Sequence, residues 1–183
     1  MAGPSTPNAL YQPEQYTKLL RGAVSLMLTP GNGVEGVIFT QYPGLGLIPN
    51  PSPGTQTAYN RLRAEGVAAW NRIAEKMTTF FPGQVMYFPI AGSIQVDGHY
   101  SAWLPPQGDP HAPSTAWVRV RKLDNVHLCP EGSARLGNAV LANMTALFDL
   151  GPAGTQWAQG AWTTDPDFND PPGACPDDHP PGG

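Results

Sequence analysis

The sequence predicts an α/β fold with three layers, in which helices flank a mostly parallel sheet, followed by an irregular proline-rich tail. Three observations favour this class. Helical and strand-like segments alternate between residues 11 and 150, the strand-like segments are apolar on both faces, and long loops containing proline separate them. Strands that are apolar on both faces are typical of parallel sheets covered by helices. We therefore expect a lead-in over 1–10, one α/β domain over 11–150, and a tail over 151–183 that packs back on the domain.

The first helix and the first strand follow the lead-in. Pro13 and Glu14 open the helix, because proline suits a first helical turn and an acid suits the positive end of the helix dipole. A strand is expected over 36–42. The prolines that begin at Pro43 keep residues 43–56 out of any strand ladder. The apolar stripe of this helix comprises Tyr16, Leu19, Leu20, Val24 and Met27.

The second helix is expected to end before Pro82, and a strand is expected over 84–89. Residues 90–115 show no regular pattern. The helical spacing of the second helix is carried by Tyr59, Leu62, Trp70, Ile73 and Met77.

A strand, a polar loop and a helix close the domain. Val118 and Val120 alternate with Arg119 and Arg121, which is the period of a half-buried strand. A helix is expected from Pro130 onward. Its buried face comprises Leu136, Val140, Met144, Leu147 and Phe148.

Asp124 and His127 lie in the loop between this strand and this helix. An aspartate three residues before a histidine, in a turn, can bring its carboxylate to one nitrogen of the imidazole ring. The carboxylate then selects the tautomer and stabilises the imidazolium that forms when the other nitrogen takes a proton. The alternative is structural, since a histidine at a helix entrance often serves as a cap or a surface group. The position after a strand favours a candidate active site.

The run Asp-Asn-Val-His-Leu-Cys-Pro-Glu-Gly-Ser-Ala-Arg-Leu from Asp124 resembles the last conserved block of the SGNH (GDSL-type) hydrolases. The resemblance covers roughly residues 11–150, as the carboxyl-terminal half of such a domain, and it implies an incomplete three-layer, flavodoxin-like fold. It implies an esterase or acyl-transfer activity in which His127 is the general base and Asp124 is its orienting carboxylate. The implied substrate is an ester, such as an O-acyl glycan or a lipid.

The nucleophilic serine of that family is not evident. The Gly-Asp-Ser block is absent, and the one Gly-Asp pair, Gly108-Asp109, is followed by proline. Ser25, Ser93 and Ser133 are the serines nearest the regular segments, and none lies in a Gly-x-Ser-x-Gly elbow. The serine would then come from an absent segment, such as a complementary amino-terminal half, or from another chain. The alternative function is a non-catalytic binding or interaction domain on the same scaffold.

The two cysteines, Cys129 and Cys175, show no metal-binding spacing. We expect them to form a disulfide that braces the loop carrying His127. Two free buried thiols are the alternative, and a nucleophilic Cys129 is disfavoured because it lies only two residues from His127 on one turn. A disulfide implies an oxidising compartment, so the parent protein would be extracytoplasmic.

Composition narrows the classes of partner. The net charge is −4, and no cluster of Lys and Arg marks a nucleic-acid surface. No run of apolar residues is long enough to span a membrane, and residues 1–8 have neither region of a signal peptide as written. No cofactor and no metal are expected. The tail has no Lys or Arg, but Trp157, Trp162 and Phe168 favour packing over disorder.

Overall fold

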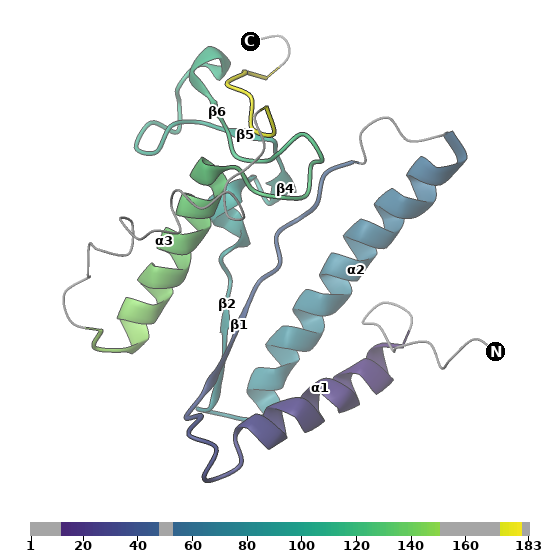
Figure 1. Cartoon of the computed structure of the whole chain (residues 1–183), viewed down its shortest axis with the longest axis vertical. Coiled ribbons are helices and arrows are strands. Elements are labelled where there is room, and N and C mark those ends of the chain that lie inside the picture. Colours follow the sequence, from purple (N-terminus) through teal and green to yellow (C-terminus); the bar gives the residue numbers. More distant parts are fainter. Residues whose placement is uncertain (1–11, 48–52, 151–172, 181–183) are drawn as a thin grey trace. The chain divides into compact units, whose positions relative to one another are not determined.

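The computed structural model describes residues 12–47, 53–150 and 173–180, with the side chains of the second helix described from Asn60 onward. The chain divides into two compact units, Met1–Gly92 and Ser93–Gly183, and each is described by itself (Figure 1).

Helices and short strands are mixed along the chain, so the α/β class is confirmed. In the described part of the chain the strands form three two-stranded sheets, one parallel and two antiparallel. The finer expectation of a three-layer, mostly parallel sheet is not confirmed. No helix among the described residues is both long and apolar enough to cross a membrane.

Unit 1 contains helices α1 (Pro13–Met27) and α2 (Pro53–Phe80) and strands β1 (Val37–Thr40) and β2 (Val85–Phe88). The helix predicted to open at Pro13 is confirmed. The second helix begins earlier than expected, at Pro53, because a proline fits the first position of a helix as well as it fits a loop.

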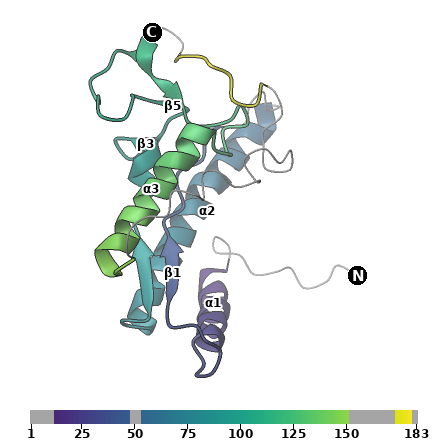
Figure 2. The ribbon, with the colours of Figure 1, turned by 60° about the vertical axis from the view of Figure 1, so that its left-hand side comes forward.

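The strands β1 and β2 pair in parallel, with Val37 opposite Val85 and Thr40 opposite Phe88. Helix α2 runs beside this pair in both views (Figures 1 and 2). The buried core between helices and strands consists of Val24, Ile73, Met77 and Val85.

A short 3₁₀ helix (Ala91–Ile94) includes the last residues of unit 1 and the first residues of unit 2. A tight hairpin of strands β3 (Gln95–Val96) and β4 (His99–Tyr100) follows in unit 2. Asp97 and Gly98 join the two strands, and both have positive φ, 49° and 76°. An Asp-Gly pair is favoured in such a turn because glycine adopts positive φ without a steric penalty and aspartate tolerates it.

A second antiparallel pair, β5 (Trp103–Leu104) and β6 (Val118–Arg119), lies between the hairpin and the last helix, with another 3₁₀ helix (Ser114–Ala116) in the connection. Helix α3 (Pro130–Leu147) follows, with Cys129 as its N-cap. The core of unit 2 is formed by Ile94, Leu104 and Val120, and by Val96, Leu128 and Leu136 around them.

Candidate functional site

The loop between β6 and α3 is closed by backbone hydrogen bonds. The amide of Lys122 donates to the carbonyl of His127 (2.9 Å), and the amide of Asn125 donates to the carbonyl of Lys122 (2.9 Å). Asn125 has a φ of 61°, a conformation that asparagine tolerates better than most residues. These bonds bring the positions of Asp124 and His127 together at the tip of the loop.

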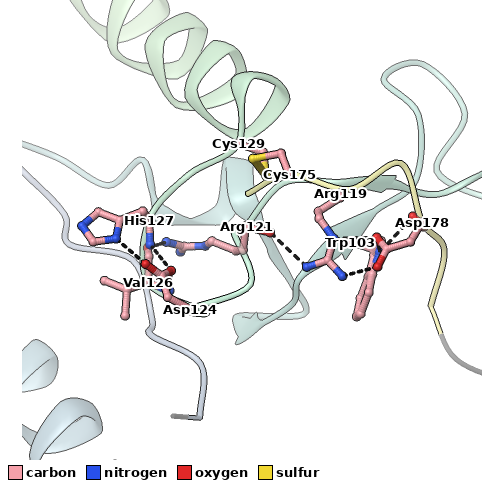
Figure 3. Close-up of a disulfide and its surroundings, with 9 residues drawn as sticks. All are labelled: Trp103, Arg119, Arg121, Asp124, Val126, His127, Cys129, Cys175 and Asp178. Atoms are coloured by element: carbon pink, nitrogen blue, oxygen red, sulfur yellow. Dashed lines mark hydrogen bonds and ion pairs between the residues drawn. A yellow bond between two sulfur atoms is a disulfide. The ribbon is translucent and has the colours of Figure 1, made fainter. Parts of the chain in front are cut away.

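The two oxygens of Asp124 have different partners (Figure 3). One oxygen, Oδ1, accepts hydrogen bonds from the amides of Val126 (2.9 Å) and His127 (3.0 Å). The other, Oδ2, lies 2.5 Å from Nδ1 of the His127 ring. The carboxylate therefore forms an Asx-type turn and orients the imidazole at the same time.

The protonation of Asp124 follows from these contacts. Partial burial raises the pKa of the Asp124 carboxyl, but hydrogen bonds from the His127 side chain and from the amides of Val126 and His127 lower it further, to about 2. Asp124 is thus a carboxylate at neutral pH. A carboxylate at Nδ1 favours the tautomer with its proton on Nδ1, which leaves the lone pair of Nε2 available to accept a proton.

The dyad is open to solvent. The side chain of His127 is 69% exposed and that of Asp124 is 47% exposed. Within the part of the chain that the structure describes, Nε2 of His127 has no hydrogen-bond partner, so no serine hydroxyl bonds to it there. Ser25 lies on α1, Ser93 lies in the first 3₁₀ helix, and Ser133 lies in the first turn of α3.

A buried arginine, Arg121, holds the loop by a hydrogen bond to its backbone. Arg121 is 2% exposed, and its Nη1 donates to the carbonyl of Val126 (2.8 Å). The guanidinium also lies over the ring of Tyr100, 5.7 Å from its centroid, and the hydroxyl of Tyr100 donates to Oδ1 of Asn125 (2.9 Å). The alternation of Val118 and Val120 with arginines predicted only a half-buried strand, so this support was missed.

The predicted disulfide is confirmed. Cys129 and Cys175 are bonded, with their Cα atoms 5.7 Å apart. Beside the bond, the amide of Leu123 donates to the carbonyl of Ala174 (3.3 Å). Residues 173–180 therefore contact the base of the loop that carries His127, whereas Trp157, Trp162 and Phe168 lie outside the described residues.

A second contact attaches residues 173–180 to the β5–β6 pair (Figure 3). The carboxylate of Asp178 accepts two hydrogen bonds from Arg119, from Nε and Nη2, each 2.5 Å long. Trp103 donates its indole N–H to Asp178 (3.0 Å), and the Arg119 guanidinium stacks 4.4 Å from the Trp103 ring centroid. Hydrogen bonds from Arg119 hold the pKa of Asp178 below its usual range, against the opposing effect of partial burial.

Comparisons of the chain with models of protein families, with curated proteins and with solved structures found no match. The chemistry of the site therefore rests on its own geometry: an ionised aspartate, a histidine with one oriented and one open nitrogen, and a buried scaffold beneath them.

Proposed function

We propose that this chain carries the base half of an SGNH-type esterase or acyl-transfer site, acting on an ester such as an O-acyl glycan or a lipid. The contact of 2.5 Å between Oδ2 of Asp124 and Nδ1 of His127 carries the proposal. In this arrangement Nε2 removes the proton from an attacking hydroxyl, and the carboxylate stabilises the imidazolium that results. The proton then passes to the alcohol that leaves the ester.

The attacking serine belongs to a segment outside the described residues or to another chain. The full SGNH-type arrangement would also extend the β1–β2 pair into the wider parallel sheet that the sequence favours. The disulfide between Cys129 and Cys175 supports an extracytoplasmic location, where such bonds persist and where acylated envelope glycans and lipids are available.

A specific observation favours the alternative, a non-catalytic binding domain. Oδ1 of Asp124 accepts two amide hydrogen bonds, and these alone would explain an aspartate at this turn. In this alternative the dyad is a structural element of an exposed loop, and substitution of His127 changes no reaction.

The test is ester hydrolysis by the protein isolated from its own cells, with the segments and partners that accompany it there. We expect turnover of p-nitrophenyl acetate, and a loss of about 10⁴-fold or more in His127→Ala and Asp124→Asn. A fluorophosphonate probe, followed by peptide mass spectrometry, would identify the serine. Turnover that is unchanged in His127→Ala, or no turnover in any preparation, would favour the binding domain instead.

A further inference from the structure

An open groove of about 580 Å³ lies between β1 and α2 in unit 1. Successive side chains of a strand point to opposite faces, so a cavity over one face of β1 would contact every second residue. This groove contacts three successive residues, and therefore runs along an edge of the strand. Its main lining residues are Ile38, Phe39 and Thr40 of β1 with Leu62, Val67 and Trp70 of α2.

The backbone of β1 shows which groups point to that edge. The amide of Val37 donates to the carbonyl of Gln84, the residue before β2, and the amide of Gln41 donates to the carbonyl of Phe88 in β2 (2.8 Å each). In a parallel pair alternate residues point their N–H and C=O groups to the same side. The groups of Ile38 and Thr40 therefore point away from β2, and no strand pairs with them among the described residues.

The same edge is already closed just beyond the carboxyl end of β1, at Tyr42. Tyr42 has the same alternation as Ile38 and Thr40, and Asn71 of α2 takes both of its backbone groups. The Tyr42 amide donates to Oδ1 of Asn71 (2.7 Å), and Nδ2 of Asn71 donates to the Tyr42 carbonyl (2.9 Å). An amide side chain thus substitutes for a neighbouring strand at Tyr42, while two residues of the edge stay open.

The open edge lacks the usual protection against strand pairing. β1 reads Val-Ile-Phe-Thr, with no charge and no proline. Parallel sheets are rarely stable as two strands, and they gain from further strands and from coverage of both faces.

We propose that β1 pairs with β1 of a second copy of this chain. In an antiparallel pair centred on Phe39, Ile38 of each copy faces Thr40 of the other, and these two facing pairs form four backbone hydrogen bonds. The result is a four-stranded sheet in the order β2-β1-β1-β2. A two-fold axis through the centre makes the contact isologous, the arrangement most common among soluble dimers.

Charge complementarity selects a second copy as the occupant. Arg63 lines the groove beside Tyr42, and its Nη1 donates to the carbonyl of Gly46 (2.7 Å). Arg63 forms no ion pair within the described residues, and neither does the exposed Glu35. Beyond the paired residues, the antiparallel register directs Glu35 of one copy toward the Tyr42 end of the other copy's β1, where Arg63 lines the groove. Each copy then supplies the carboxylate that the other's Arg63 lacks.

Sedimentation equilibrium of the whole chain tests the pairing, from about 1 μM to about 1 mM, where weak interfaces dissociate. We expect a monomer–dimer equilibrium. Thr40→Pro removes an N–H that points only to the open edge and leaves the β1–β2 ladder intact, so it should weaken the dimer about tenfold or more. Thr40→Val keeps the N–H and should dimerise as the wild type does.

Reversing the charges of Arg63 and Glu35 tests the dimer without any substitution in β1 itself. Arg63→Glu alone and Glu35→Arg alone should each weaken the dimer, and the double variant should restore it. This result is independent of the proposed activity, because all these residues lie in unit 1 and the dyad lies in unit 2. A monomer at every concentration would overturn the proposal. So would a dimer that is insensitive to Thr40→Pro, or a double variant that fails to recover, since the groove would then have another occupant.

Discussion

Gly132, in the first turn of α3, lies directly against the carbonyl of Val120. A Cβ built on Gly132 would lie 2.2 Å from the Val120 oxygen and 3.1 Å from its carbonyl carbon. Both contacted atoms are backbone, and Val120 is fully buried, so neither can move aside without disturbing the core of unit 2. The close approach of helix and strand end requires glycine at this position.

We expect Gly132→Ala to lower the free energy of unfolding of unit 2 by about 1–3 kcal/mol, the usual effect of overpacking. Gly137→Ala is the matched control, because it lies on the same helix with open space around its Cα. That control should raise stability by about 0.5–1 kcal/mol, since alanine favours a helix more than glycine does. Urea unfolding of both variants measures the difference, and equal stabilities would contradict the close packing.

The pH dependence of stability provides a second prediction. The pKa of Asp124 is about 2 in the folded protein, below the ordinary value near 3.8. A lowered pKa stabilises the fold fully above about pH 4, and this contribution disappears as the pH falls through 2. Because half of the side chain is exposed, we expect a contribution below about 1 kcal/mol. Asp124→Asn should remove this part of the acid sensitivity, as measured by thermal melts between pH 5 and pH 2, and an unchanged profile would contradict the contact with His127.

Replacement of Arg121 tests the support beneath the dyad. Arg121→Met keeps the bulk of the side chain but leaves the carbonyl of Val126 without its donor, so stability should fall by about 1–3 kcal/mol. The ring signals of His127 in NMR spectra should broaden as the loop loosens. Arg72→Met makes the same chemical change at an exposed position of α2 and should leave both readouts unchanged.

The disulfide is tested by its removal. Thiol titration of the denatured, unreduced protein should find no free thiol. Reduction should increase hydrogen exchange in residues 173–180 and in the His127 loop before unit 1 changes, because Cys129 adjoins that loop. Cys175→Ser should lower stability by roughly 4 kcal/mol or less, as expected for a closed loop of 46 residues. Two titratable thiols would contradict both the brace and the inferred oxidising compartment.

The isolated chain should show no esterase activity that depends on His127. Without a serine at Nε2, no acyl-enzyme can form, so wild type and His127→Ala should hydrolyse p-nitrophenyl acetate at the same background rate. A robust rate that His127→Ala abolishes would show that this chain contains its own nucleophile. Ser5 and Ser52, which lie outside the described residues, would then be the first serines to replace.

Short sequence patterns predicted the features that depend on a few residues each. The helix over Pro13–Met27 follows from a proline and an acid in its first turn. The proximity of Asp124 to His127 follows from a three-residue spacing, and the pairing of Cys129 with Cys175 follows from an even cysteine count. The burial of Arg119 could not be predicted in the same way. Its partner, Asp178, is 59 residues away, and no periodic pattern marks that separation.

The predicted three-layer, mostly parallel sheet is not confirmed, and the reason is related. An apolar stretch predicts a strand but does not indicate which other strand pairs with it. In the structure β6 pairs antiparallel with β5, which lies in the segment 90–115 where the sequence shows no regular pattern. Two-residue strands such as Trp103–Leu104 are too short to show any alternation. Their pairing depends on contacts that only the folded chain brings together.

The position of Cys175 sets the order in which the site matures during synthesis. The ribosome completes the histidine loop and all of α3 before Cys175 is made, and the bond to Cys129 can close only after that. Until then the loop lacks both the bond and the contact with Ala174. A nascent chain therefore carries an unbraced dyad until Cys175, which is translated after α3, closes the bond to Cys129.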